Sequence, residues 1–267
     1  MKIAVVTVHY TGTWTAGMLL ALKRLLAQVP SPSQIHVANT ACAANALREV
    51  DSSSEVRPRI IVHDNIGLEF GAYQAGIDAA RSEGAPDWLV FANDTFHRHQ
   101  ILPGAYLDNL ALHLGRRVQH PIIVGQIEGL TRSFEFCGAR THRWITTNVF
   151  ALNRPALDAI DWRIYDNRLE ALITETHDPE RFISPDVDPV LGEHITSFLF
   201  NRKGEYDAWY AAAPLSEANA PRLARKARSI LQEKALSARL EGVSAEFASI
   251  RDISFFGQVA VRLMDRA

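Results

Sequence analysis

The feature that most constrains the fold is a repeated unit, in which an apolar strand-like run ends in polar residues and leads towards a helix. Four such runs occupy residues 3–8, 34–37, 59–63 and 88–92. The first is continuous and β-branched, as expected of a strand covered on both faces. Helical patterns at 15–28 and 70–81 alternate with these strands. This alternation predicts an α/β fold with a mostly parallel sheet and helices on both faces.

Polar residues directly follow all four strands. They are His9, Asn39, Asp64 with Asn65, and Asn93 with Asp94. Ligands of open parallel sheets bind at the carboxyl ends of the strands. The polar strand ends therefore predict a binding site along this one edge of the sheet.

The most distinctive local motif is NIGLEFGAYQAG, which begins at Asn65 after the third strand. Gly67 is expected to adopt a positive φ angle, and Gly71 is expected to let a backbone or a ligand approach closely. The motif is not the dinucleotide fingerprint, which needs G-x-G-x-x-G in the first β–α unit, and the chain has no Walker sequence. The alternative interpretation is a tight β–α connection with no ligand.

Asp94 lies one step beyond a buried strand. A carboxylate at this position is suited to hold a hard divalent cation or a sugar hydroxyl. The alternative for Asp94 alone is a turn or a helix cap.

Composition excludes several classes of protein. The 267 residues suit one large domain with a C-terminal extension. A net charge of −2 disfavours nucleic acid as a partner. Two cysteines make neither a disulfide framework nor a four-cysteine zinc site. The chain shows no signal peptide and no membrane span, so we expect a cytoplasmic protein that meets a membrane only peripherally.

The order of these motifs resembles the nucleotide-binding half of inverting GT-A glycosyltransferases. It is most similar to the rhamnan-synthesis F-like glycosyltransferases of bacterial surface polysaccharide and O-antigen assembly. In that group the glycine motif reads Asn-x-Gly-x-Asp-x-Gly-Ala, and a later strand ends in Asn-Asp-Ser, compared with Asn93-Asp94-Thr95 here. The segment 142–150 resembles the family's His-x-x-Ser-x-Phe segment, and Glu193 resembles the start of its Glu-x-x-Leu-(Ser/Thr) helix. The resemblance covers about residues 1–210.

The resemblance implies a GT-A-like, Rossmann-like fold and transfer of a sugar from a nucleotide-diphosphate donor. The acceptor would be a growing bacterial polysaccharide or a lipid-linked glycan. The residues implied in donor binding are His9, Tyr10, Asn39, Asp64, Asn65, Gly67, Gly71, Asn93 and Asp94.

The chain departs from the family at the metal site, because Ala92 replaces the first aspartate of Asp-x-Asp. Asp94 is then the one remaining ligand, so we expect at most a weak Mg²⁺ or Mn²⁺ site. Arginine matches phosphate bidentately and is an alternative partner for the leaving diphosphate. The cationic candidates for the diphosphate or the acceptor are Arg132, Arg140, His142 and Arg143. A solvated surface loop is the other interpretation of these arginines.

Inverting transfer needs a general base that takes the proton of the acceptor hydroxyl. The candidates are Glu193, Asp186 and Asp188. Asp188 precedes Pro189 and a helix, so it is also a natural N-cap. Glu193 carries the resemblance and ranks first, with Asp186 second.

The character of the chain changes near Ala220, which predicts a domain at 1–219 and a helical extension at 220–267. The extension has two interpretations: its basic residues face anionic lipid, or its apolar stripe packs on the first domain or on a second copy. Packing is favoured, because the apolar residues near the end of the chain are expected to be covered: Phe247, Ile250, Ile253, Phe255 and Phe256. A rival function is a GT-like subunit that binds nucleotide sugar or glycan and has lost turnover. Another Rossmann-like transferase, such as a methyltransferase, is disfavoured because the first turn lacks a glycine-rich loop.

Overall fold

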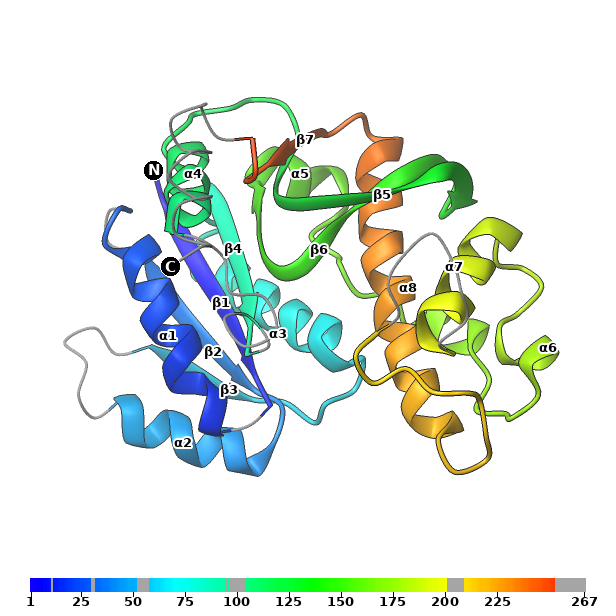
Figure 1. The fold of residues 1–267 in the computed structure, drawn as a ribbon. Helices are drawn as coiled ribbons and strands as arrows, with labels where there is room; N and C mark the ends of the chain where they lie inside the picture. The colour runs from blue at the N-terminus through cyan, green and yellow to red at the C-terminus, as the bar shows by residue number, and fades with distance from the viewer. Residues whose placement is uncertain are drawn as a thin grey trace, which may run out of the picture.

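A seven-stranded sheet organises the chain, with strand order β3-β2-β1-β4-β6-β5-β7 (Figure 1). The computed structural model describes residues 1–10, 12–29, 32–51, 58–94, 96, 104–200 and 209–252. The strands are β1 Ile3–His9, β2 Ser33–Ala38, β3 Arg59–Val62, β4 Trp88–Asn93, β5 Ile122–Phe136, β6 Ala139–Asn153 and β7 Glu246–Ser249.

The pairing confirms a mostly parallel sheet. Strand β1 lies parallel to β2 and β4, and β2 lies parallel to β3. Strand β6 runs antiparallel to both β4 and β5, and β7 is parallel to β5. His9 lies opposite Ala38, and Val8 lies opposite Asn93, so neighbouring strands end together. We call the residues that follow the ends of β1, β2, β3 and β4 the carboxyl edge.

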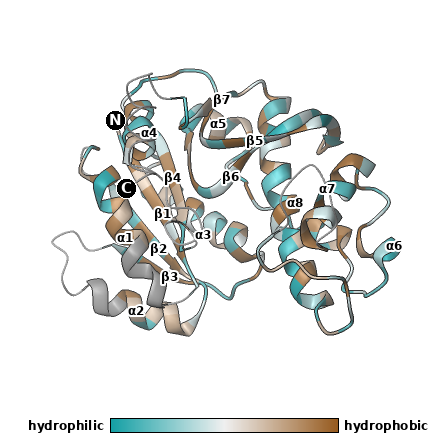
Figure 2. Cartoon of the chain, viewed as in Figure 1, coloured by the Kyte–Doolittle hydropathy of each residue, from teal (hydrophilic) through white to brown (hydrophobic). Residues whose placement is uncertain are grey.

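Helices cover both faces of the sheet, as the alternating pattern predicts. They are α1 Gly12–Leu26, α2 Ala41–Asp51, α3 Leu68–Ser82, α4 Gly104–Leu114, α5 Arg154–Ala159, the 3₁₀ turn η1 Asn167–Leu172, α6 Pro179–Phe182, α7 Pro189–Leu199 and α8 Ala220–Gly242. Helices α1 and α4 pack on one face, and α3, α5 and α8 pack on the other. Figure 2 shows the hydrophobic colouring of β1 and β4 between these layers.

The middle of the chain is more regular than the sequence suggests. The sequence pattern predicts short strands at 122–126 and 147–152, with an irregular aromatic and basic segment at 132–143 between them. Instead β5 and β6 form a hairpin of two 15-residue strands whose register shifts twice. Its distal half packs with η1, α6, α7 and α8 in a separate core. The register shifts interrupt the alternation of apolar and polar residues along β5 and β6. The sequence pattern therefore does not indicate the full length of these strands.

The segment after residue 219 is built into the same body as the sheet. Helix α8 begins at Ala220, where the boundary was expected, and its predicted apolar stripe is buried. Leu236 and Leu240 join the core of the sheet, and β7 extends the sheet beside β5. Phe255 and Phe256, expected to be covered, lie outside the described residues. No helix of the described residues is long and apolar enough to cross a membrane.

Candidate functional site

Asp94 stands at the centre of the carboxyl edge, directly after β4. Its side chain is buried, and its Oδ2 accepts a hydrogen bond of 2.7 Å from the Tyr10 backbone N–H. Its own backbone N–H donates to the Val8 carbonyl at 3.0 Å. Asp94 therefore fastens the end of β1 to the end of β4, and the predicted position at a central strand end is confirmed.

Tyr10 connects this point to the neighbouring turns. Its carbonyl accepts a hydrogen bond of 2.7 Å from the Thr40 hydroxyl, and its phenol donates to Glu69 Oε2 over 3.4 Å. Burial first, and then the Glu69 carboxylate, raise the pKa of Tyr10 well above its ordinary value. The other Glu69 oxygen accepts a hydrogen bond from the Ser229 hydroxyl of α8. The carboxyl edge is thus joined to α3 and to α8.

The turn after β3 supplies amide groups to the same edge. Asn39 is buried; its Oδ1 lies 2.8 Å from His63 Nδ1, and its Nδ2 donates to the Leu68 carbonyl. Asn65 has a φ of 65°. Its buried Oδ1 accepts no hydrogen bond from the described residues. Because a buried amide oxygen is costly to leave unsatisfied, an ordered water is the expected partner of Asn65 Oδ1. Asp64 is exposed, and its Oδ1 accepts from the Ile66 N–H.

Gly67 and Gly71 of the motif shape the start of α3, as predicted. Gly67 precedes α3 with a φ of 70°, a left-handed conformation, and lies against the Tyr165 ring. At Gly71, an added Cβ would overlap the Ile66 carbonyl oxygen. The Ile66 turn therefore packs directly on the backbone of α3, which brings Asn65 and Glu69 to the edge.

A bulge of β6 faces the carboxyl edge. The register of β6 shifts between Ile145 and Phe150, and side chains of other elements satisfy the backbone there. The Thr147 N–H and hydroxyl donate to Glu233 Oε2, both at 3.1 Å, and the Ile145 N–H donates to the Ser237 hydroxyl at 3.0 Å. Bulges next to functional sites are common, because they redirect side chains and carbonyls.

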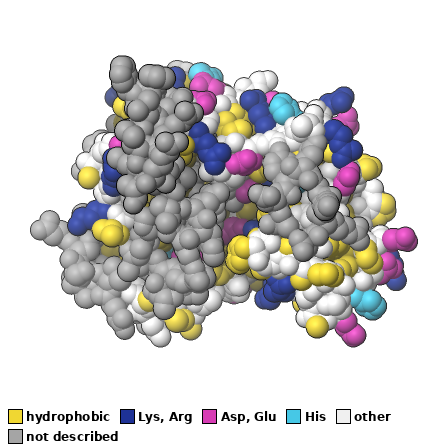
Figure 3. All heavy atoms as spheres, viewed as in Figure 1, with side chains coloured by type: hydrophobic (Ala, Val, Ile, Leu, Met, Phe, Trp, Pro, Cys, Tyr) yellow, Lys and Arg dark blue, Asp and Glu magenta, His cyan; other side chains and the backbone are white. Residues whose placement is uncertain are grey.

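Tyr73 is fully buried, and its phenol donates a 2.9 Å hydrogen bond to the Thr147 carbonyl. Burial raises the pKa of Tyr73 well above its ordinary value, and Glu69, Asp94 and Glu233 raise it further. These acids come from α3, β4 and α8 respectively. The carboxyl edge is therefore an acidic centre, and Figure 3 shows acidic side chains between the sheet and the α7–α8 part of the molecule.

A continuous series of contacts leads from this centre to α7. Lys234 is buried, and its Nζ lies 2.8 Å from Glu233 Oε1 and 3.5 Å from the centre of the Trp144 ring. The Trp144 ring in turn lies 5.1 Å from the His194 ring of α7. Burial lowers the pKa of Lys234 to about 8, and burial with Lys234 lowers the pKa of His194 to about 3.

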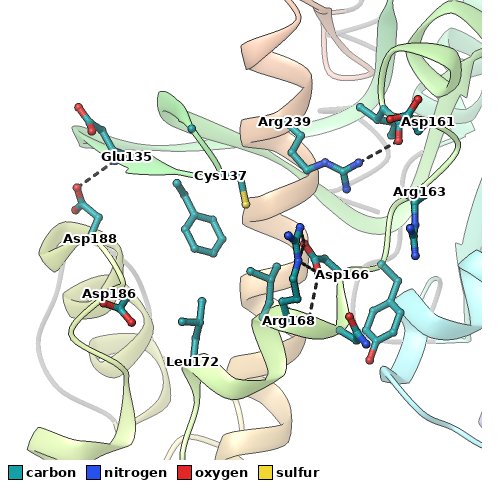
Figure 4. A pocket seen from close by; sticks show the side chains of 16 residues that line it. Glu135, Cys137, Asp161, Arg163, Asp166, Arg168, Leu172, Asp186, Asp188 and Arg239 are labelled. Atoms are coloured by element: carbon teal, nitrogen blue, oxygen red, sulfur yellow. Dashed lines mark hydrogen bonds and ion pairs between the residues drawn. The ribbon is translucent and has the colours of Figure 1, made fainter.

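The three base candidates lie in different surroundings. Asp188 caps α7, because its oxygens accept the Val190 and Glu135 backbone N–H groups at 2.8 and 3.1 Å. Exposed Asp186 accepts a 3.2 Å hydrogen bond from the Ser184 hydroxyl and lines, with Asp188, a separate cavity (Figure 4). Glu193 is exposed on α7, next to His194, and pairs with Arg132 of β5.

The remaining cationic candidates belong to β6, and they lie beside the end of α8 that is remote from the acidic centre. Arg143 pairs with Glu241 at 3.0 Å and stacks on Phe247. Glu241 is eight residues beyond Glu233, which is about 12 Å of helix. Arg140 and His142 are exposed on the same hairpin. The structure therefore brings none of these three side chains to Asp94.

His9 faces the interior rather than the edge. It is fully buried, and its Nε2 lies 2.8 Å from the Thr7 hydroxyl and 3.1 Å from His36 Nδ1. Burial, with a smaller contribution from His36, lowers the pKa of His9 well below its ordinary value. His9 therefore supports the end of β1 from below.

The described residues do not fit a tightly held divalent cation. Ala92 packs in the core with α1 and α4 and offers no ligand beside Asp94. The carboxylates of Glu69 and Glu233 already accept hydrogen bonds from neighbouring residues. Among the described residues, no three His, Cys, Asp or Glu side chains are placed to hold an ion.

Three polar residues of this centre are not among the candidates that the sequence indicates: Glu69, Glu233 and Ser229. Glu69 had a signal, because it occupies the aspartate position of the Asn-x-Gly-x-Asp-x-Gly-Ala motif. Glu233 and Ser229 had none, since a polar residue on an amphipathic helix is normally assigned to the solvent face.

No protein-family model and no curated protein matches this chain. Among solved structures, the mannosyltransferase PcManGT from Pyrobaculum calidifontis, in complex with GDP-Man and Mn²⁺, is 9% identical with a TM-score of 0.44, over 99% of this chain and 79% of that one. TarS 1–349 from S. aureus is 12% identical with a TM-score of 0.40, over 60% of this chain. This chain spans about half (49%) of the TarS chain. A 4-diphosphocytidyl-2C-methyl-D-erythritol synthase is 9% identical with a TM-score of 0.39, over 62% of this chain and 82% of that one. These likenesses decide neither the family nor the function.

Proposed function

We propose that the protein is a glycosyltransferase that binds a nucleotide-diphosphate sugar at the carboxyl edge. The observation that carries the proposal is the convergence of Asp94, Tyr10 and Asn65 on one edge of the sheet, with Glu69 beside them. This is the edge at which open parallel sheets bind ligands. The acids offer acceptors for ribose and sugar hydroxyls.

The finer assignment rests on the motif resemblance. We propose an inverting enzyme of the rhamnan-synthesis F-like type, which extends a bacterial surface polysaccharide or lipid-linked glycan. It would act in the cytoplasm or at the inner face of the membrane. In the proposed step, the acceptor hydroxyl attacks the anomeric carbon, the bond to the diphosphate breaks, and a carboxylate takes the hydroxyl proton.

Glu193 remains our first choice for this base. Asp188 is engaged by two backbone N–H groups, and Asp186 faces the cavity of Figure 4. Glu193 carries one ion pair, to Arg132, and is the residue on which the family resemblance falls. Glu193→Gln should leave donor affinity almost unchanged while transfer collapses.

The test of the proposal compares two aspartates at opposite ends of β4. Asp94→Asn keeps a side-chain oxygen for the Tyr10 N–H but removes the charge. It should lower donor turnover about a hundredfold or more, the scale of losing one electrostatic stabiliser. Asp87→Asn is the matched control, because Asp87 accepts the Lys2 N–H at 2.6 Å at the other end of the strand. Near-normal turnover of Asp94→Asn would place the donor elsewhere.

A subunit that binds a nucleotide sugar without turnover is the second candidate, and Ala92 favours it. The two functions separate when nucleoside diphosphate release is measured beside donor binding. Binding without release, with or without candidate acceptors, would support the second candidate.

A further inference from the structure

A cavity of about 1240 Å³ lies between α8, the tip of the β5–β6 hairpin, the segment 160–172 and the start of α7 (Figure 4). Its volume exceeds the roughly 300–1,000 Å³ of pockets for single small ligands. The cavity is lined by both acceptors and donors, namely five carboxylates and three guanidinium groups. It therefore has room and hydrogen-bonding groups for a chain of several polar units.

The charges of the cavity indicate the class of ligand. Five carboxylates against three arginines leave an excess of two negative charges, which disfavours a polyanion. Part of the charge is already paired, since Arg168 binds Asp166 at 2.6 Å. The Arg163 guanidinium makes no hydrogen bond or ion pair with the other described residues that line the cavity (Figure 4). A ligand that both donates and accepts hydrogen bonds and carries no net charge fits this lining, and each sugar hydroxyl does both.

The cavity is connected to the carboxyl edge through two shared elements. The Tyr165 ring lines the cavity and also packs against Gly67, at the start of α3. Gln232 of α8 binds both the N–H and the carbonyl of Asp166, at 3.1 and 2.8 Å. One turn earlier on the same helix, Ser229 binds Glu69 of the acidic centre. The wall of the cavity and the acidic centre are thus held by the same helix.

We infer that this cavity binds a neutral, hydroxyl-rich oligosaccharide, as a stretch of the acceptor chain. This inference rests on the proposed transfer function, because that function makes the bound glycan an acceptor. Binding of the glycan to the cavity is measured without any donor. Asp186 is then a carbohydrate-binding side chain. Its carboxylate and the Arg163 guanidinium supply an acceptor and a donor from opposite walls of the cavity.

The experiment uses the full chain on an array of tri- to hexasaccharides, in neutral forms and in forms that carry a uronic acid or a phosphate. The unmodified protein should bind neutral members. The double variant Arg163→Ala/Asp186→Asn should bind them about tenfold or more weakly. Both positions are exposed, so the fold should persist. The matched control is Arg117→Ala/Glu180→Gln, which changes one exposed arginine and one exposed acid outside the cavity and should bind like the unmodified protein.

Binding of neutral oligosaccharides that the double variant loses and the control keeps supports the inference. Three results overturn it: no binding by any array member, binding of anionic members alone, or equal binding by the double variant. Nucleoside-diphosphate binding, followed by thermal shift on the same proteins, should be equal in all of them. If that binding is present and the array is silent, the cavity inference fails while the donor proposal stands. If nucleotide binding is absent, the donor proposal fails.

Discussion

At the scale of single residues, the carboxyl edge depends on groups that each contact several elements. Tyr10 uses its N–H, its carbonyl and its phenol to reach Asp94, Thr40 and Glu69. Because these three hydrogen bonds reach three different elements, Tyr10 fixes the positions of the strand ends relative to one another. A change at one of these groups is therefore expected to disturb the edge as a unit.

The buried pair of histidines predicts a stability that falls in mild acid. Because the pKa of His9 is lowered in the folded protein, the unfolded chain binds more protons below the ordinary histidine pKa of about 6.5. Its contribution is present above that pH and is lost as pH falls. Between about pH 7.5 and 5.5, His9 should account for roughly 1 kcal/mol of the fall in the free energy of unfolding.

The measurement is urea unfolding at both pH values, for the unmodified protein and for His9→Gln. The variant should show a shallower loss, because glutamine does not titrate. An equal loss in both proteins would show that His9 is not the responsible group.

Two helical glycines should respond oppositely to alanine. Gly71→Ala places a Cβ on the Ile66 carbonyl and should destabilise the protein by about 1–3 kcal/mol, because α3 must shift away from the turn. Gly192→Ala in α7 meets nothing within 4 Å and should stabilise by up to about 1 kcal/mol. Thermal unfolding of the two variants checks both signs. A Gly71→Ala protein as stable as Gly192→Ala would disprove the close approach.

At the scale of elements, α8 differs from an ordinary amphipathic helix. Its buried surface includes Ser229, Gln232, Lys234 and Ser237 as well as the apolar stripe. Ser237 and Gln232 satisfy backbone atoms of the β6 bulge and of segment 160–172, while Ser229 and Lys234 bind the carboxylates of Glu69 and Glu233. The helix is thus both a packing element and a source of hydrogen-bond partners for the site.

Lys234 provides the test of this interpretation. Lys234→Met removes one partner of a buried ion pair and should lower the free energy of unfolding by about 3–5 kcal/mol. Adding Glu233→Gln should restore part of the loss, because no unpaired charge then remains next to Thr147. Denaturant unfolding of the two single variants and the double variant gives the coupling. Additive losses would mean that the two side chains act separately.

The sequence predicts the elements that obey a local pattern. The four apolar strands and α3 lie within a few residues of their expected positions, because each carries its own periodicity and turn residues. The β5–β6 hairpin and the polar face of α8 carry no such local pattern. They are stabilised by pairs of residues that are distant in sequence, such as Glu233 with Thr147. The carboxyl edge was found from strand ends alone. Glu233, whose partners are distant in sequence, was not.

At the scale of the whole molecule, the sheet and the α6–α8 part meet around the acidic centre. The core of the sheet includes Leu236 and Leu240 of α8, while the other face of α8 belongs to the core around α7. The arrangement places the carboxyl edge on one side of α8 and the cavity of Figure 4 along the same helix. The proposed donor site and the proposed oligosaccharide site would therefore share one helix, which suits a transfer reaction.

The most direct test of the central claim, donor binding at the carboxyl edge, is a thermal-shift screen of nucleoside diphosphates with and without Mn²⁺. A ligand that binds the folded state raises the melting temperature by mass action. We predict that one nucleoside diphosphate raises it in the unmodified protein and in Asp87→Asn, already without Mn²⁺, and that Asp94→Asn changes this shift. A screen with no shift for any nucleotide, or an identical shift in Asp94→Asn, would contradict the claim.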